Sequence, residues 1–285
     1  MIPSSFDYLR PGTVEECLAL LAEHGEDAKV LAGGHSLLPL MKLRLAAPAQ
    51  LLDIGRIAEL RGVRDAGDHL AVGAMTTHDE LVRNPLVRDH CGILAEAASV
   101  VADPQVRHRG TFGGALAHGD AAGDLPAVAV ALEAGLVVEG PAGQRVVPAT
   151  EFFHGYLETA MSPDELLVEV RVPKLPAGWT WRYEKLSRVS HMWAIVGACA
   201  VVRWDDDAIA EARVGLANMG AVPVRARAAE EALAGAGRGA VGEAAALAPE
   251  GTDPPADLHA EPDYRRQLAR ALTRRALEGA AARWS

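Results

Sequence analysis

Cysteine is scarce in this chain, and its few cysteines lie far apart. The three residues Cys17, Cys91 and Cys199 cannot form a CxxC metal knuckle or the cysteine set that holds an iron–sulfur cluster. The ten histidines include no HExxH pattern. We therefore expect no metal centre built by this chain, so that any redox chemistry would depend on an organic cofactor. The odd cysteine count favours reduced thiols and a cytoplasmic location.

Long apolar runs and a surplus of basic charge are also missing. No segment reaches the roughly 18 consecutive apolar residues of a membrane-spanning helix. The opening residues MIPSSFDYLR have no basic stretch followed by an apolar run, so we expect no signal peptide. The net charge of −10 predicts repulsion from the phosphates of nucleic acids. We expect a globular protein without a membrane span and without a nucleic-acid partner.

The first 56 residues predict a small α/β unit. A helix over GTVEECLALLAEHG would begin at a capping box formed by Thr13 and Glu16 and would end at Gly25. The segments AKVLAGG and AQLLDIG have the composition of short buried strands. We therefore assign residues 1–56 to a first unit.

Residues 57–173 predict a second unit of mixed strands and helices. Strands are expected over HLAVGA, GLVVEG, QRVVPA and DELLVEVRVPKL, with Pro173 ending the last of them. Helices are expected over THDELVRN, LVRDHCGILAEAASVVA and residues 125–133, with a long glycine-rich loop before the third helix.

The pattern changes after Pro173. TWRYEKLS, WAIVGACAVVRW and IAEARVGLANM are successive strand candidates, and helices follow near residues 225–233 and 264–278. We therefore predict an α+β chain whose last unit, residues 174–285, is an antiparallel sheet with helices.

The stretch AGGHSLLPLMKLRLA, residues 32–46, places two glycines after a short apolar strand. Glycine reaches positive φ without strain, so successive N–H groups around Gly33 and Gly34 can face one concavity and bind an anion. Ser36 would add a hydroxyl donor. The same residues are equally typical of a simple tight turn, and this stretch alone leaves both interpretations open.

A second glycine-rich stretch, GTFGGALAHGDAAGD, covers residues 110–124. It matches neither the GxGxxG nor the GxxxxGK[ST] pattern. Two loops that allow close backbone approach favour one long ligand held at both ends, such as a dinucleotide. Asp120 and Asp124 could accept hydrogen bonds from its hydroxyl groups, or could cap the next helix.

Charged residues near these loops have two interpretations each. Arg107 and Arg109 could pair with a phosphate or form surface ion pairs. The histidines in loops could serve as acid–base groups or as packing residues; they are His35, His108, His118 and His191.

These two stretches closely resemble the flavin-binding motifs of the FAD-binding medium subunit of molybdenum hydroxylases, the aerobic carbon monoxide dehydrogenase and xanthine dehydrogenase family. FFHGYLETAMSPDELLVEVRVP, ARVGLANMGAVPVRARAAEEALAG and YRRQLARALTRRAL resemble later parts of the same family, so the resemblance covers nearly the whole chain. It implies a two-subdomain FAD-binding domain of the vanillyl-alcohol-oxidase type over residues 1–56 and 57–173. A C-terminal sheet-plus-helices domain over residues 174–285 would follow.

The resemblance implies non-covalent FAD and no catalytic or metal-binding residue on this chain. The turn at residues 32–37 would hold the pyrophosphate, and the second loop would approach the flavin. Leu167 matches an apolar position beside the isoalloxazine. Lys185 matches a lysine whose positive charge would favour an anionic reduced flavin. Trp193 matches an aromatic residue that covers the flavin ring. The implied FAD-binding residues are Ala32, Gly33, Gly34, His35, Ser36, Leu37, Gly110, Thr111, Gly114, Asp124, Leu167, Lys185 and Trp193.

The chain departs from the family pattern after Lys185. Where relatives often have R-R-x-G-D-F-A, this chain has RVSHMWA over residues 188–194. Met192 replaces an acid, His191 adds a titratable group, and Trp193 enlarges the aromatic ring. These changes bear on flavin access and on the choice of electron acceptor.

By resemblance the chain is the electron-transfer subunit of a molybdenum hydroxylase. It would pass electrons from a 2Fe-2S small subunit through FAD to an external acceptor, within a dimer of heterotrimers. Substrate would be oxidised on a large subunit that carries the molybdenum cofactor. The alternatives are a stand-alone FAD-dependent oxidoreductase, with His191 as its acid–base candidate, and a binding module that has lost FAD. Intact glycines in both loops disfavour the last.

Overall fold

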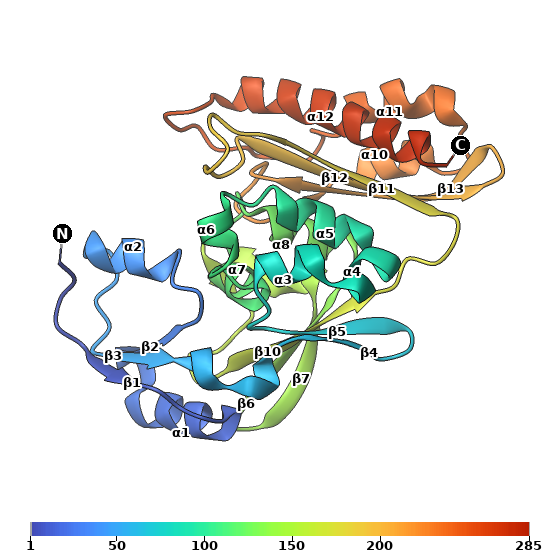
Figure 1. The fold of residues 1–285 in the computed structure, drawn as a ribbon. Helices are drawn as coiled ribbons and strands as arrows, with labels where there is room; N and C mark the ends of the chain where they lie inside the picture. The colour runs from blue at the N-terminus through green and yellow to red at the C-terminus, as the bar shows by residue number, and fades with distance from the viewer. Residues whose placement is uncertain (1, 285) are drawn as a thin grey trace.

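The N-terminal part of the chain forms a three-stranded parallel sheet with a helix beside it (Figure 1). The structure is a computed structural model that describes residues 2–284. The central strand β3 is parallel to both of its neighbours, in the order β1-β3-β2. The α/β order predicted for this region is confirmed. Its elements are β1 (Asp7–Leu9), α1 (Val14–His24), β2 (Ala28–Leu31), α2 (Leu37–Lys42) and β3 (Gln50–Asp53).

Helix α1 begins and ends at the predicted residues, with one difference at its start. The Thr13 hydroxyl accepts the N–H of Glu16 at 3.1 Å, as a capping box requires. The Glu16 carboxylate, however, accepts the N–H of Gly12 at 2.6 Å, one residue earlier than the box predicts. Gly25 ends the helix with a φ of 53°, a conformation that glycine adopts without strain.

A five-stranded antiparallel sheet forms the middle of the molecule, in the order β4-β5-β10-β6-β7. The helices of the next layer cover one of its faces, and α1 packs on the other. The strands are β4 (Val63–Asp65), β5 (His69–Gly73), β6 (Gly135–Gly140), β7 (Gly143–Pro148) and β10 (Leu166–Pro173). A short hairpin of β8 (Phe153–Gly155) and β9 (Glu158–Thr159) follows α9 (Ala149–Phe152). The 3-10 turns are η1 (Gly25–Asp27), η2 (Ile54–Arg56), η3 (Ala58–Leu60) and η4 (Arg238–Ala240).

A β-bulge in β10 decides which core each of its apolar residues joins. The register with β6 shifts between Leu167 and Glu169. Leu167, before the bulge, packs under the helices, whereas Val168, the extra residue of the bulge, packs in the core beside α1. After the bulge, Val170 also packs under the helices, although regular alternation would place it with Val168. The bulge therefore places Val170 on the same, helical side of the sheet as Leu167.

The helical layer differs from the sequence prediction at Cys91. The helix expected across residues 86–102 is two helices, α4 (Pro85–His90) and α5 (Gly92–Ser99), separated by a non-helical Cys91. A Cβ atom on Gly92 would lie 2.4 Å from the Trp181 ring, so the chain bends where this tryptophan packs on it. The helix α3 (His78–Arg83) is confirmed, and α6 (Pro104–Arg107) and α8 (Asp124–Ala131) complete the layer apart from α7.

The glycine-rich stretch contains a helix where a long loop was predicted. Helix α7 (Phe112–His118) begins at Thr111, whose hydroxyl accepts the N–H of Gly114 at 3.1 Å. Phe112 and Leu116 are fully buried. The cap and this burial offset the low helix propensity of the two glycines.

The C-terminal unit is a four-stranded antiparallel sheet covered by three helices, as predicted in outline. Figure 1 shows the sheet between these helices and the α3–α8 layer. In β12 one set of alternate residues, such as Val202, faces the covering helices, while Cys199 and Val201 face the helical layer. The elements are β11 (Trp179–Leu186), β12 (Val196–Asp205), β13 (Ala208–Ala217), β14 (Val224–Arg225), α10 (Arg227–Leu233), α11 (Val241–Ala246) and α12 (Pro262–Ala282).

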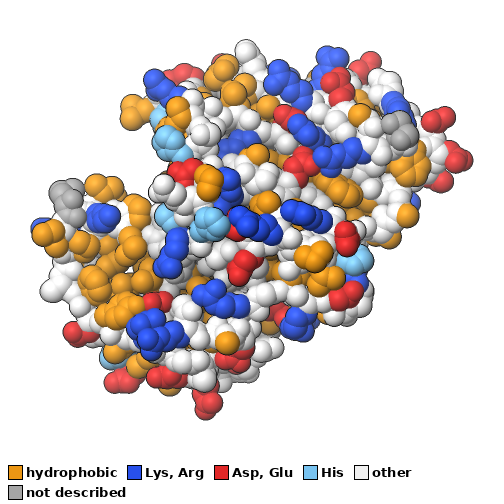
Figure 2. All heavy atoms as spheres, in the orientation of Figure 1, with side chains coloured by type: hydrophobic (Ala, Val, Ile, Leu, Met, Phe, Trp, Pro, Cys, Tyr) orange, Lys and Arg blue, Asp and Glu red, His pale blue; other side chains and the backbone are white. Residues whose placement is uncertain are grey.

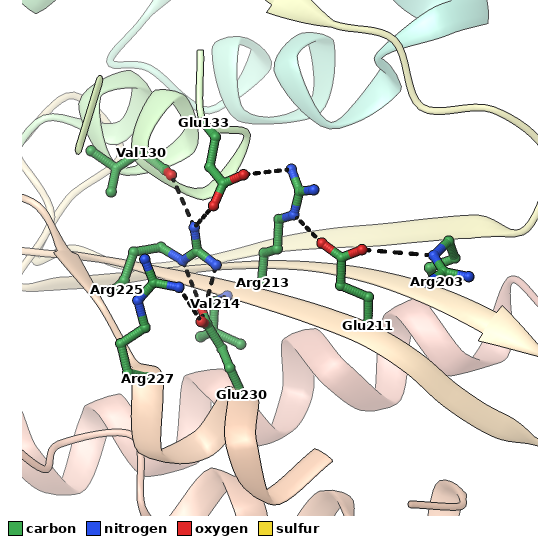
Figure 3. Close-up of polar contacts among 9 residues, drawn as sticks. All are labelled: Val130, Glu133, Arg203, Glu211, Arg213, Val214, Arg225, Arg227 and Glu230. Atoms are coloured by element: carbon green, nitrogen blue, oxygen red, sulfur yellow. Dashed lines mark hydrogen bonds and ion pairs between the residues drawn. The ribbon is translucent and has the colours of Figure 1, made fainter. Parts of the chain in front are cut away.

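A network of arginine and glutamate side chains fastens this sheet to the end of α8 (Figure 3). Arg225 donates to Glu230 at 2.6 Å and to Glu133, which follows α8, at 3.1 Å. Arg213 pairs with the other oxygen of Glu133 at 3.6 Å. Because the Arg225 and Glu230 side chains are only 7% and 8% exposed, each needs the other to satisfy its charge.

Replacing Arg225 is expected to destabilise the fold more than replacing its neighbour Arg227. Arg225→Ala leaves Glu230 buried without its main partner, a change that costs about 3 kcal/mol of unfolding free energy. Arg227 also pairs with Glu230, at 3.4 Å, but its side chain is 59% exposed, so Arg227→Ala should cost less than about 1 kcal/mol. Urea unfolding followed by circular dichroism measures both. Equal losses would show that burial does not control this network.

Candidate functional site

A cleft of about 840 Å³ lies between the N-terminal unit and the helical layer. Figure 2 shows the surface hollowed beside the N-terminal lobe, where α2 faces the helices in the view of Figure 1. All residues that the sequence resemblance assigned to cofactor binding line this one cleft. They are Ala32, Gly33, Gly34, His35, Ser36, Leu37, Gly110, Thr111, Gly114, Asp124, Leu167, Lys185 and Trp193.

The first glycine loop offers unused backbone donors to the cleft. Gly34 has a φ of 80°, in the region that favours glycine. Within the described part of the chain, the N–H groups of residues 33–36 donate to no protein acceptor. Buried backbone donors are normally paired, so a group of free N–H donors along a cleft is suited to an anionic ligand.

The glycines also let the two loops touch each other. A Cβ atom on Gly33 would lie 2.2 Å from the carbonyl oxygen of Arg109. A Cβ atom on Gly114 would lie 2.6 Å from the Thr111 hydroxyl and 3.5 Å from the Ala32 side chain. From the sequence, we explained these glycines by the close approach of a ligand to the backbone. The structure adds a second reason, which is the close approach of one loop to the other.

Asp124 is a buried residue of the cleft and is bound by two side chains of β11. Lys185 Nζ lies 2.8 Å from one carboxylate oxygen, and the Tyr183 hydroxyl donates to the other at 2.6 Å. Burial raises the pKa of Asp124, an effect that the Lys185 charge and the Tyr183 hydrogen bond oppose. Burial also raises the pKa of Tyr183 well above its ordinary value, which keeps this hydroxyl a donor.

This arrangement changes two expectations from the sequence. Asp124 does not cap α8, because the cap residue is Gly123 and Asp124 is the first residue of the helix. Lys185 is not an isolated cation, because its ammonium group is paired with Asp124 and also donates to the Val100 carbonyl at 3.3 Å. The pair brings little net charge to the cleft.

Leu167 and Trp193 contribute apolar surface to the cleft from different elements. Leu167 is buried in β10 beside the bulge. Trp193 belongs to the connection between β11 and β12 and is 51% exposed at the cleft, so it is not a core residue of the C-terminal sheet. His191 and Met192 line the same edge.

The arginines before the second loop lie outside the residues that line the cleft. Arg107 donates to the carbonyl groups of Val101 and Ala102 at 3.0 and 3.2 Å. Arg109 makes no side-chain ion pair or hydrogen bond within residues 2–284. His108 lies 3.4 Å from Asp79 at the surface. Of the loop histidines, His35, His118 and His191 line the cleft.

His78 is a residue of the cleft that the sequence analysis missed. It is 5% exposed, and its Nδ1 atom is buried without a hydrogen-bond partner. Its backbone N–H donates to the carbonyl of Gly110 at 3.0 Å, which ties α3 to the second loop. Burial, and to a lesser degree the nearby His35 and Arg107, lowers the pKa of His78 to about 4. A position just after a helix cap gives no sequence signal for this role.

Among residues 2–284, no helix has the length and apolar character needed to cross a membrane. The same residues bring together no group of His, Cys, Asp and Glu side chains that could hold a metal ion. The three cysteines are separately buried free thiols.

The stability of the protein is expected to depend on His78 between pH 6.5 and pH 4. The pKa of His78 is near 4 when folded and near its ordinary 6.5 when unfolded, so the unfolded chain binds the proton more readily in this range. Stability should therefore fall as the pH falls, by up to about 3 kcal/mol from this group. His78→Gln should remove this part of the slope.

Urea midpoints at pH 7.5 and pH 5 measure the effect. At pH 7.5 the histidine is neutral in both states, so a difference between the two proteins there reports packing alone. Parallel pH slopes in the two proteins would contradict the assignment.

Comparisons with known proteins agree with this geometry. The model of the FAD binding domain in molybdopterin dehydrogenase matches residues 4–175, and that of the CO dehydrogenase flavoprotein C-terminal domain matches residues 181–280. The chain is 45% identical to the carbon monoxide dehydrogenase medium chain of Hydrogenophaga pseudoflava, over 99% of each chain. It is 38% identical to the caffeine dehydrogenase subunit beta of a Pseudomonas species, over 99% of this chain and 97% of the other.

A solved structure supports the same assignment. A chain of the Hydrogenophaga pseudoflava carbon monoxide dehydrogenase that lacks the Mo-pyranopterin moiety of its cofactor superposes with a TM-score of 0.97 and 47% identity, over 99% of each chain. The two-part fold predicted from the sequence, a FAD-binding domain followed by a sheet domain, is thereby confirmed. The chain belongs to the FAD-binding medium subunits of the molybdenum hydroxylases, the family of carbon monoxide dehydrogenase and xanthine dehydrogenase.

Proposed function

We propose that this medium subunit binds FAD non-covalently in the cleft and relays electrons from a 2Fe-2S partner subunit to an external acceptor. The observation that carries the proposal is the meeting of both glycine loops at one cleft with unused N–H donors. The cleft volume of about 840 Å³ falls within the range of roughly 300–1,000 Å³ common for cofactor and ligand pockets. FAD supplies the redox chemistry, an isoalloxazine that accepts and releases electrons.

Different residues of the cleft would bind different parts of FAD. The N–H groups of residues 33–36 and the Ser36 hydroxyl hold the pyrophosphate, while Ala32 and Leu37 flank this loop. Gly110, Thr111 and Gly114 keep the second loop close to it. Leu167 would pack against the isoalloxazine, and Trp193 would cover it.

The Asp124–Lys185 pair fixes the orientation of a hydrogen-bond acceptor in the cleft. The Tyr183 and Lys185 donors fix the Asp124 carboxylate, so its remaining lone pairs have a defined direction for a ligand hydroxyl. The Asp124 carboxylate neutralises Lys185. We therefore infer that the stabilisation of an anionic reduced flavin depends on how tightly this pair is held, rather than on a free cation.

The relay function is supported by where the cysteines lie. Cys17 packs in the N-terminal core, and Cys91 and Cys199 pack in the helical core, each inside apolar surroundings. An iron–sulfur cluster needs a set of converging cysteines, so a cluster that donates electrons to this chain would have to lie on another chain. Reduced buried thiols also fit the proposed cytoplasmic location.

The names of the relatives support a multi-subunit assembly. One is a medium chain and another a subunit beta, of dehydrogenases named for carbon monoxide and for caffeine. We therefore place substrate oxidation on a large subunit with the molybdenum cofactor, and expect a dimer of heterotrimers. Within this chain we assign residues 1–56 and 57–173 to the two FAD-binding subdomains and residues 174–285 to the C-terminal domain.

Substituting Gly34 is expected to remove FAD from an otherwise folded chain. A Cβ atom there would lie 2.9 Å from Leu38 Cδ1, and valine at its φ of 80° adds strain of about 1–3 kcal/mol. Gly34→Val should weaken FAD retention at least about tenfold, which corresponds to about 1.4 kcal/mol. Gly67→Val is the matched control, because Gly67 has a φ of 97° and open space around it.

FAD is measured in the supernatant after acid precipitation of the purified protein. Release of all flavin from the unmodified chain supports non-covalent binding, and flavin in the pellet would refute it. Full FAD occupancy in Gly34→Val would remove the first loop from the binding site.

The relay function is tested by the isolated, FAD-loaded chain. We expect it to be reduced by dithionite but to oxidise neither carbon monoxide, purines nor aldehydes with artificial acceptors, since the substrate site lies elsewhere. The same tagged chain, purified with its partners, should bring down a 2Fe-2S subunit and a molybdenum-containing subunit. Robust substrate oxidation by the chain alone would instead establish a stand-alone flavoenzyme.

A further inference from the structure

Asn218 joins two segments that both contribute residues to the cleft. It follows the last residue of β13, and its backbone N–H donates to the carbonyl of Ala121 at 2.7 Å. Its side-chain amide donates to the carbonyl of Ala194, also at 2.7 Å. Both acceptor residues are buried, so each carbonyl gains a partner that water would not readily replace.

The backbone of Asn218 is held in a conformation that suits this bridge. Its φ is 62°, in the left-handed region, which asparagine tolerates better than most residues. This turn at the end of β13 lets the backbone N–H and the side chain reach acceptors in two separate segments. A residue without an amide side chain could keep the first hydrogen bond but not the second.

Each segment ends at a residue of the cleft. Ala121 belongs to the turn of residues 120–123, in which Asp120 accepts the N–H of Ala122 at 2.8 Å, and this turn leads directly into Asp124. Ala194 follows Trp193 directly. Asn218 therefore connects the turn before Asp124 with the loop that ends at Trp193.

The loop of residues 187–194 has few other attachments. Its base is closed by the Ile195 N–H, which donates to Leu186 at 2.8 Å, and by Arg265, which donates to the Ile195 carbonyl. Within the loop, Met192 donates to Val189 at 3.0 Å. Residues 188–191 are exposed, so contacts at the base decide where the tip lies.

We propose that Asn218 is a positioning residue that sets the place of Trp193 relative to Asp124, and thereby the shape of the outer edge of the FAD cleft. The proposal rests on the proposed function for its effect on FAD, but the bridge itself is a property of the chain alone. Asn218 contacts the carbonyl of Ala194, next to Trp193, and that of Ala121, three positions before Asp124, and it acts through these two contacts.

Two variants separate the side-chain bond from the backbone conformation. Asn218→Gly keeps the positive φ and the backbone N–H but removes the amide. Asn218→Asp keeps the shape but replaces the donor with a carboxylate oxygen facing the Ala194 carbonyl. Ser190→Ala is the control, because it changes the same loop at an exposed residue that makes no hydrogen bond in the described structure.

Hydrogen exchange of the full chain, without added FAD, measures the effect first. Loss of one hydrogen bond should speed exchange in peptides over residues 187–195 about fivefold, more in Asn218→Asp than in Asn218→Gly. Peptides over residues 119–123 should be unchanged, because the bond to Ala121 remains, and Ser190→Ala should match the unmodified chain. Unchanged exchange at 187–195, or faster exchange spread equally over β12 and α12, would overturn the proposal.

Flavin emission of the FAD-loaded chains then tests the consequence for the cleft. Because we propose that Trp193 covers the flavin ring and quenches its emission, Trp193→Ala should fluoresce more brightly than the unmodified chain. Both Asn218 variants should also be brighter and approach the emission of Trp193→Ala, while Ser190→Ala should not. Unchanged emission in both variants would overturn the effect on Trp193. If the unmodified chain retains no FAD, the proposed function fails, but the exchange result still decides whether Asn218 holds the loop.

Discussion

The contact between Gly33 and the carbonyl of Arg109 is the constraint on which the cleft depends. Gly33 follows a strand of the N-terminal sheet, whereas Arg109 precedes the helix cap of the second loop. A side chain at Gly33 would have to occupy the position of that carbonyl, 2.2 Å away. The two halves of the cleft can therefore meet only where one of them has no side chain, and any group larger than hydrogen would push the loops apart.

Two further glycines allow the C-terminal sheet to pack closely on the helical layer. A Cβ atom on Gly215 would lie 2.3 Å from the Ala127 carbonyl of α8, and one on Gly197 would lie 2.5 Å from the Tyr183 hydroxyl. The first glycine lets β13 approach α8, and the second leaves room for the hydroxyl that binds Asp124. The buried ion pair forms because this packing brings Lys185 of β11 to the start of α8.

Most of the elements could be predicted from the sequence because their signals are local. Thr13 and Gly25 mark the ends of α1, and alternation over residues 166–173 marks β10. The break at Cys91 could not be predicted, because it depends on Trp181, a residue distant in sequence that packs on Gly92. Helix α7 was missed for a related reason, since its glycines predict a loop until the burial of Phe112 is known.

The residues that the sequence proposed for FAD binding all line one cleft, but their contacts with one another were not predicted. Motifs identify which residues line the cleft, because each motif is short and keeps its neighbours together. The partners of Asp124 lie on β11, about sixty positions further along the chain, so the Lys185 and Tyr183 contacts appear only in three dimensions. His78 was missed because burial, not sequence context, makes it unusual.

The loop of residues 187–194 contains the departure from the family pattern that the sequence analysis inferred, and the packing shows that this loop can vary without disturbing a core. Val189, His191 and Trp193 are exposed, so substitutions there disturb no core. The base of the loop is held separately, through Ile195, Arg265 and Asn218. A fixed base with an exposed tip allows the edge of the cleft to change while the Asp124–Lys185 pair and the loop contact at Gly33 stay as they are. The residues that could change access to the cleft are therefore different from the residues whose contacts form the cleft.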